Sequence, residues 1–370
     1  MSMPSSNAAC RSVRLGLKVI FVALGFFFLA GCGPNGDHPD VSGISVGDVH
    51  IIRFDTAFFS LDSNHIAPGL YRLDQQYPYF TGDFVGNILG AGPLSDTSLV
   101  AFAAAREFLV SYLGISDSLK NKYQRLDWLE KELQQGFRYI KYYFPKYQLP
   151  GHVVSFIGPF DGPGVAITND ALAIGLQSYA GANFSIYLTG KGQDTYPRYV
   201  SRRFEPQYID ANCMAALATD IFPDSSDSRP MIEQMIIKGR YWWLAGKLLP
   251  DAPDSITTGY SQAQLDWCTH NEGAIWGFFL QNTDLYTIDA DIIKNYIGEG
   301  PKTEGMPEGS PGNIGAWVGW QIVKKYAQEH SHLRPVDVMR IPARTLFEES
   351  KYKPKYGLCV GSGHRGCRGG

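Results

Sequence analysis

The sequence lacks the residue patterns of several common enzyme classes. None of its 8 histidines has another four positions away, so no His-Glu-x-x-His helix of the kind that binds catalytic zinc is present. No Gly-x-x-x-x-Gly-Lys-Ser/Thr loop for nucleotide phosphates occurs either. The sequence therefore offers no direct evidence for a zinc peptidase or a nucleotide-dependent enzyme.

The chain also has fewer basic than acidic residues, and it has few cysteines. The formal net charge is −3, and Arg11, Arg14 and Lys18 are the only basic residues before position 32. The rest of the chain is thus more acidic still, which argues against a nucleic-acid partner. Of the 6 cysteines, only Cys213 and Cys268 lie in the body of the chain. A disulfide between them and two separate buried thiols are both compatible with the sequence.

What is present begins with an export signal. The three basic residues precede an uncharged apolar stretch, Val19–Ala30, which is too short to span a bilayer but suits a signal peptide. Leu29-Ala30-Gly31-Cys32 follows and resembles the bacterial lipobox, in which cleavage before the cysteine is coupled to its acylation. We expect residues 1–31 to be removed and Cys32 to anchor the chain to a membrane, with no other segment spanning it.

The remaining chain divides into three parts. Residues 32–49 are rich in Gly, Asp, Pro and Ser, which predicts a flexible tether. Residues 50–355 form the predicted globular domain, and the glycine-rich residues 356–370 form a predicted disordered tail. Cys359, His364 and Cys367 in that tail match no common zinc spacing, so we expect no metal and no other cofactor.

The pattern within 50–355 predicts a single, mainly helical α+β domain with a small β-sheet. Apolar residues repeat at helical spacing from Leu126 to Phe144, and strands are predicted at 49–54, 152–157, 164–168 and 171–176. Asn169-Asp170 suits a hairpin turn between the last two strands. Further helices are predicted over 206–221, 231–248, 262–280 and 313–328. Helices, a strand cluster and more helices favour α+β over alternating α/β.

A few polar residues in apolar surroundings are candidates for a site. Glu272 lies near tryptophans, where burial would raise its pKa and suit it to acid–base work, although a structural hydrogen bond to a neighbouring helix end or Arg is the favoured explanation. Tyr260, Asn271 and Lys238 are the other candidates for a polar pocket. Packing is the favoured explanation for the glycines and tryptophans of the second half, rather than a sugar-stacking surface.

Several sequence motifs in the second half of the chain resemble those of one family. Met235-Ile236-Ile237-Lys238-Gly239-Arg240-Tyr241, Asn271-Glu272 with Trp276, and the segment Pro311–Val323 resemble the GldB family of gliding-motility lipoproteins. That family is similar to zinc peptidases, which implies a zincin-like scaffold. The counterpart of the zinc helix here, residues 206–221, has no histidine, and Lys238-Gly239 stands where the peptidases have Glu-Gly. A lysine ammonium repels a cation, so the resemblance implies a degenerate scaffold without metal or catalytic residues.

The resemblance implies a non-catalytic lipoprotein of the gliding and protein-export apparatus. We expect it to face the periplasm, with the outer membrane favoured over the inner because Gly33 is not acidic, and to contact other envelope proteins. Two alternatives stay open. One is a hydrolase based on Glu272 and a second carboxylate such as Asp254 or Asp266. The other is a glycan-binding lipoprotein that uses exposed tryptophans.

Overall fold

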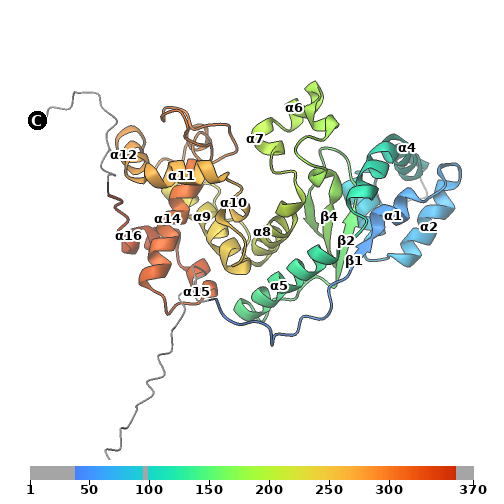
Figure 1. Cartoon of the computed structure of the whole chain (residues 1–370), viewed down its shortest axis with the longest axis horizontal. Coiled ribbons are helices and arrows are strands. Elements are labelled where there is room, and N and C mark those ends of the chain that lie inside the picture. Colours follow the sequence, from blue (N-terminus) through green and yellow to red (C-terminus); the bar gives the residue numbers. More distant parts are fainter. Residues whose placement is uncertain (1–37, 95–98, 356–370) are drawn as a thin grey trace, which may run out of the picture. The chain divides into compact units, whose positions relative to one another are not determined.

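A four-stranded mixed sheet separates two hydrophobic clusters (Figure 1). The computed structural model describes residues 38–94 and 99–355. The strand order is β1-β2-β4-β3, with β1 parallel to β2, β2 parallel to β4, and β3 antiparallel to β4. The strands are β1 Ile51–Arg53, β2 His152–Phe156, β3 Val165–Ile167 and β4 Ala171–Gly175.

The central strands are apolar on both faces because helices cover both sides. Along β2, Val153 packs into the larger cluster and Val154 into the smaller one. All four predicted strands are present, and the predicted hairpin joins β3 to β4. The sheet is nevertheless mostly parallel, which the order of elements did not predict.

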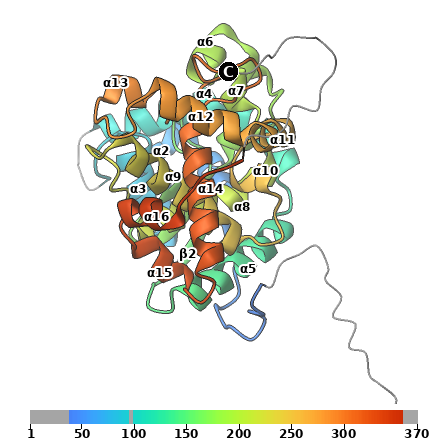
Figure 2. The same ribbon diagram turned by 90° about the vertical axis from the view of Figure 1, so that its left-hand side faces the viewer.

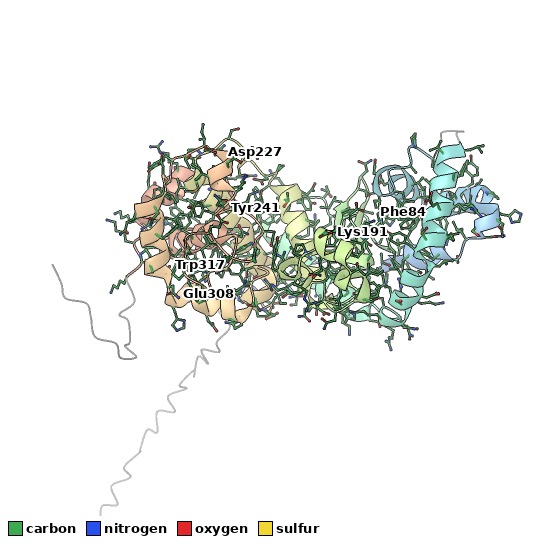
Figure 3. The ribbon with its side chains drawn as sticks, turned by 90° about the horizontal axis from the view of Figure 1, so that it is seen from above. Phe84, Lys191, Asp227, Tyr241, Glu308 and Trp317 are labelled. Carbon is green, nitrogen blue, oxygen red and sulfur yellow. The ribbon has the colours of Figure 1, made fainter. Side chains whose placement is uncertain are left out.

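Aromatic residues dominate the smaller cluster, on the N-terminal side of the sheet. Phe54, Phe58, Phe80 and Phe84 are fully buried there, with edge-to-face contacts between Phe54 and Phe80 and between Phe58 and Phe84 (Figure 3 labels Phe84). The elements that build it are α1 Phe54–Phe59, a 3-10 turn Ser63–His65, α2 Ile66–Gln76, α3 Thr81–Asp83, a π-helical turn Phe84–Ile88 and α4 Leu99–Lys122.

Helix α4 bears on the expectation that no segment beyond the signal spans a membrane. By length and composition alone it is apolar enough to cross one. However, Arg106 and Glu107 lie in its middle, and its inner face, with Ala105 and Leu109, packs into the smaller cluster. Its other face, which includes Val110 and Leu113, is exposed, so only part of this helix is buried in the domain.

Helix α5, Asp127–Tyr143, confirms the predicted apolar stripe. Every residue of the stripe is less than 10 % exposed because this face packs into the larger cluster. The stripe consists of Leu126, Leu129, Leu133, Phe137, Ile140 and Phe144.

The C-terminal half is a helical body in which α14 packs against α9 and α16 (Figure 2). Trp317 of α14 is buried among these helices (Figure 3). The longer helices are α8 Ile209–Ile221, α9 Met231–Leu248, α11 Gln262–His270, α12 Glu272–Asn282, α14 Ile314–Glu329 and α16 Ala343–Ser350. The shorter helices are α6 Gly190–Thr195, α7 Arg198–Ser201, α10 Asp254–Thr257, α13 Ala290–Ile293 and α15 Pro335–Arg340, with 3-10 turns at Leu176–Tyr179, Ser185–Leu188 and Pro206–Tyr208.

The predicted helices are confirmed with one exception. Helix α9 has the predicted bounds, and α8 and α14 agree within a few residues. The single helix predicted over 262–280 is instead two helices, α11 and α12, separated at Asn271. The structure is therefore mainly helical with a small mixed sheet, as the predicted class requires.

The segment before β1 lies against the domain. Within residues 38–49, part of the predicted tether, Val41 is 1 % exposed and belongs to the larger cluster. Gln134 Nε2 of α5 donates to the Gly47 carbonyl at 3.1 Å. The part of the predicted tether that can lie free of the domain is therefore shortened to the residues before Val41. Residues 33–37, the predicted signal at 1–31, Cys32 and the predicted tail at 356–370 lie outside the described residues.

Cys213 and Cys268 are both free and buried, which decides between the two alternatives that the sequence left open. Burial raises the pKa of both thiols far above the ordinary value. We expect neither to react with iodoacetamide in the folded protein and both to react after denaturation without a reductant. Mass mapping of the alkylated peptides checks this. A Cys213–Cys268 disulfide-linked peptide would contradict it.

Candidate functional site

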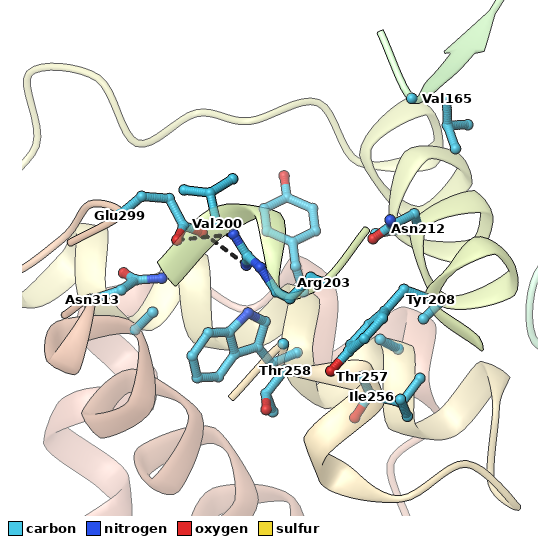
Figure 4. A pocket seen from close by; sticks show the side chains of 18 of the residues that line it. Val165, Val200, Arg203, Tyr208, Asn212, Ile256, Thr257, Thr258, Glu299 and Asn313 are labelled. Atoms are coloured by element: carbon cyan, nitrogen blue, oxygen red, sulfur yellow. Dashed lines mark hydrogen bonds and ion pairs between the residues drawn. The ribbon is translucent and has the colours of Figure 1, made fainter. Parts of the chain in front are cut away.

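A cavity of about 710 Å³ with polar and apolar lining residues lies at the edge of the sheet. It lies between the edge strand β3, one face of α8, one face of α9 and the loops around Thr258 and Glu299. In Figure 4, Val165 and Asn212 lie across the cavity from Arg203 and Glu299. We call it the edge pocket.

Helix α8 contributes a wall of small side chains. Ala211, Asn212, Ala215 and Thr219 all line the edge pocket, because positions i, i+1, i+4 and i+8 share one face of a helix. Asn212 Nδ2 donates to the Tyr179 hydroxyl at 2.9 Å. The alanines leave room for a ligand to approach the helix closely.

Helix α9 contributes charge and aromatic surface. Lys238 forms an ion pair with Asp224, and the Tyr241 hydroxyl donates to the Phe222 carbonyl at 2.6 Å. Burial would raise the pKa of Asp224, but the bonds from Lys238 and Ser226 outweigh it and hold that pKa below its ordinary value. Burial raises the pKa of Tyr241 to about 12. At neutral pH this wall therefore presents a neutral phenol and a compensated ion pair.

A second ion pair closes the opposite side. Arg203 Nη1 donates to Glu299 Oε1 and Nη2 lies by Oε2, both at 3.0 Å, in a two-pronged contact (Figure 4). Behind it, Arg202 Nη2 donates to the Gly259 carbonyl at 2.5 Å and to Gln264 Oε1 at 3.2 Å. Burial lowers the pKa of Arg202 without removing its charge near neutral pH. The pocket thus combines hydrogen-bonding groups, the ion pairs Arg203–Glu299 and Lys238–Asp224, and small apolar side chains. Such a lining suits the binding of a ligand.

The structure separates the four residues predicted as one polar pocket. Lys238 lines the edge pocket, whereas Tyr260 is buried behind it and donates to the Gly312 carbonyl at 2.6 Å. Asn271 bonds the Trp267 carbonyl at the junction of α11 and α12. Glu272 Oε1 accepts a hydrogen bond from the Tyr352 hydroxyl at 2.7 Å, the structural role weighed from the sequence. Within residues 38–94 and 99–355, no hydrogen bond joins any two of the four.

The tryptophans are mainly core residues, as favoured from the sequence. Trp243, Trp317 and Trp320 are each less than 10 % exposed. Trp242 is half-buried, lines the edge pocket and packs edge-on against Tyr260 with centroids 5.1 Å apart. The two carboxylates weighed as partners of Glu272, Asp254 and Asp266, are exposed.

Sequence reasoning missed most of the edge pocket. The Arg203–Glu299 pair joins residues 96 positions apart, so no local spacing indicates it. Ala211 and Ala215 of α8, four residues apart, were the one local indication of a helix face with small side chains. The sequence also contains Gly43-Ile44-Ser45-Val46-Gly47, the spacing of a hydrolase nucleophile motif. The structure gives this stretch neither strand nor helix and leaves Ser45 exposed, so the strand-to-helix elbow is missing.

In the part of the chain that the structure describes, no group of three or more His, Cys, Asp or Glu side chains has a metal-binding arrangement. Comparison with known proteins gives one match. A family model described as "Gliding motility protein GldB" matches residues 34–354, most of the chain. No curated protein and no solved structure matches.

Proposed function

Because the chain belongs to the GldB family of gliding-motility lipoproteins, we propose that it works by binding another envelope protein of the gliding and export apparatus. The edge pocket is the proposed binding surface, and the occupant is an extended segment of the partner. The observation that carries this proposal is that β3 is the edge strand, with no strand of the described residues paired on its outer side, beside a cavity of about 710 Å³.

The free edge offers ready-made hydrogen bonds. Gly164 and Thr168 bond toward β4, through Gly175 N–H to the Gly164 carbonyl and Thr168 N–H to the Ala171 carbonyl. Since hydrogen-bonding direction alternates along a strand, the N–H and C=O groups of Val165 and Ile167 point away from β4. Such a row of groups binds an added strand, and the cavity beside it accepts alternate side chains.

We further propose that the scaffold is a zincin-like one that has lost its metal site. Ala211, Asn212 and Ala215 occupy the i, i+1, i+4 spacing that zinc peptidases fill with His, Glu and His, and all three line the edge pocket. Lys238, at the position of the third ligand, lines the same cavity and is paired with Asp224. Alanine side chains hold no metal, and an ammonium disfavours one, which supports binding without catalysis.

The proposed location follows from the family and the lipobox. Lipoprotein membership supports a lipid anchor in the cell envelope. We propose that the domain faces the periplasm from the outer membrane, with Cys32 as the acylated residue. The hydrolase alternative has less support, because Glu272 is bonded to Tyr352 and does not line the edge pocket.

Filling the edge pocket tests the proposal. Ala215 is exposed on α8, so Ala215→Trp places an indole in the cavity without disturbing the core. We expect cells carrying it to lose single-cell gliding and colony spreading at normal protein level, because the partner segment cannot enter. The matched control is Ala263→Trp, an exposed alanine of α11 that does not line the pocket, which should glide normally.

Two results would contradict the proposal. Normal gliding of the Ala215→Trp strain would show that the edge pocket is not needed. Loss of gliding in Glu272→Gln alone, with unchanged protein level and melting temperature, would favour the hydrolase.

A further inference from the structure

A second cavity, separate from the proposed function, lies on another side of α8. It has a volume of about 580 Å³ and is lined by α5, the start of α8 and the segment after α9. We call it the acidic pocket. Its charged lining residues are all carboxylates, Glu132, Asp210 and Asp251, and no Lys, Arg or His side chain is among the residues that line it.

The rest of the lining is largely apolar. Trp128 of α5 faces it, together with Leu248, Leu249 and Ile256. A cavity with apolar walls and a few convergent carboxylates is shaped for an amphipathic cation, which places its stem on the walls and its charge on the acids.

Asp210 is the residue that points to a ligand. Only 7 % of the surface of this residue is exposed, yet it lines the acidic pocket. Its Oδ1 is buried and forms no hydrogen bond with any described residue. A buried acceptor without a partner costs folding free energy, and such groups are rare in native proteins unless a function retains them.

The protonation of Asp210 agrees with an unfilled cation site. Burial raises the pKa of Asp210 well above its ordinary value, and the neighbouring Glu132 carboxylate adds to the rise. Asp210 therefore holds a proton more readily than an exposed aspartate does. An incoming cation would replace that proton.

We propose that the acidic pocket binds an organic cation, an ammonium or guanidinium on an aliphatic stem, with its charge between Asp210 and Glu132. The stem lies against Trp128 and Leu249. A metal ion is not favoured, because no three carboxylates among the described residues have a metal-binding arrangement. Either a free amine or a Lys or Arg side chain of a protein supplies this chemistry, and the test distinguishes them.

The probe for a free amine is cadaverine, and its neutral control is 1,5-pentanediol. Isothermal titration of the full-length protein in detergent should show cadaverine binding and no diol binding. The probe for a protein side chain is acetyl-Ala-Lys-Ala-amide, with norleucine in place of lysine as control. Tighter binding of the lysine peptide than of cadaverine assigns the site to a protein, and the reverse assigns it to a free amine.

Asp210→Asn should weaken binding of the better probe by more than about tenfold, because it removes a buried charge partner. Its melting temperature should stay equal or rise, since an unpaired buried carboxyl stabilises nothing. Asp227→Asn, the same charge change at an exposed loop residue outside the pocket, should leave the affinity unchanged. Affinity in the wild type should rise with pH, as Asp210 loses its proton, and this dependence should flatten in Asp210→Asn.

Several results would overturn the proposal. One is the absence of binding by cadaverine and by the lysine peptide at millimolar concentrations. Another is equal affinity of the wild type and Asp210→Asn. A large fall in the melting temperature of Asp210→Asn would make the carboxyl structural. Glu132→Gln, at an exposed position, gives a second measurement that does not depend on folding of the first variant.

Discussion

Gly319→Ala is expected to lower the free energy of unfolding by about 3 kcal/mol or more. Helices α9 and α14 cross with their backbones in contact. A Cβ on Gly319 would overlap the carbonyl oxygen and carbon of Met235, and one on Gly239 would overlap the backbone of Trp320. Backbone atoms of a helix cannot turn aside as a side chain does, so the two helices would have to separate. Denaturant unfolding of the domain, expressed without its signal and lipid, measures the loss.

Gly246→Ala is the matched control on α9. A Cβ there meets nothing within 4 Å, so the exchange should leave stability unchanged or raise it by about 0.5–1 kcal/mol. If Gly319→Ala were as stable as the wild type, the close approach of α9 and α14 would be wrong. Equal losses of unfolding free energy in Gly319→Ala and Gly246→Ala would show that any substitution in these two helices destabilises the domain.

The sequence predicted elements whose signal is local. The stripe of α5 and the bounds of α9 follow from spacing along one helix, and β2 and β4 follow from short apolar runs. The glycines of α14 were likewise predicted to allow close packing, and Gly315 and Gly319 do lie against α9. Each of these needed only neighbours within a few residues.

Elements that depend on distant partners were not predicted. Helix α1 is only six residues long, so the single i, i+4 pair Phe54 and Phe58 is too short a pattern to indicate a helix, and both residues are buried by the cluster formed with α2, α3 and α4. The order of elements also gave no sign that β1 and β2 pair in parallel across about 100 residues.

The prediction that the candidate residues share one pocket was wrong for the same reason. Glu272 and Asn271 are adjacent in sequence, yet one bonds Tyr352 and the other the Trp267 carbonyl. The edge pocket is assembled from β3, α8, α9 and two loops, and only Lys238 of the predicted residues lines it. Proximity along the chain does not determine which surface a side chain faces.

Cys32→Ser is the change with the largest expected effect on function. A thioether-linked lipid needs the cysteine, so cells fed an alkyne fatty acid should show no label on this protein. When the variant is exported on a signal that is cut without lipidation, the domain should also move from the membrane to the soluble fraction. Acyl chains contribute about 0.8 kcal/mol of membrane affinity per buried methylene, which no side chain near the terminus replaces. Cys359→Ser, at the other end of the chain, is the control and should keep both label and location.

The structure adds a geometric reason to expect lost gliding. Val41 is already packed into the domain, so only residues 33–40 join Cys32 to it, and they span at most about 29 Å. A domain held this close to the membrane meets membrane-bound partners at a high effective concentration, and release into the periplasm dilutes it. Cys32→Ser cells should therefore fail to glide even with normal amounts of folded protein. Full gliding from an unlabelled, soluble protein would show that the anchor is dispensable, and a label that survives Cys32→Ser would place the lipid on another residue.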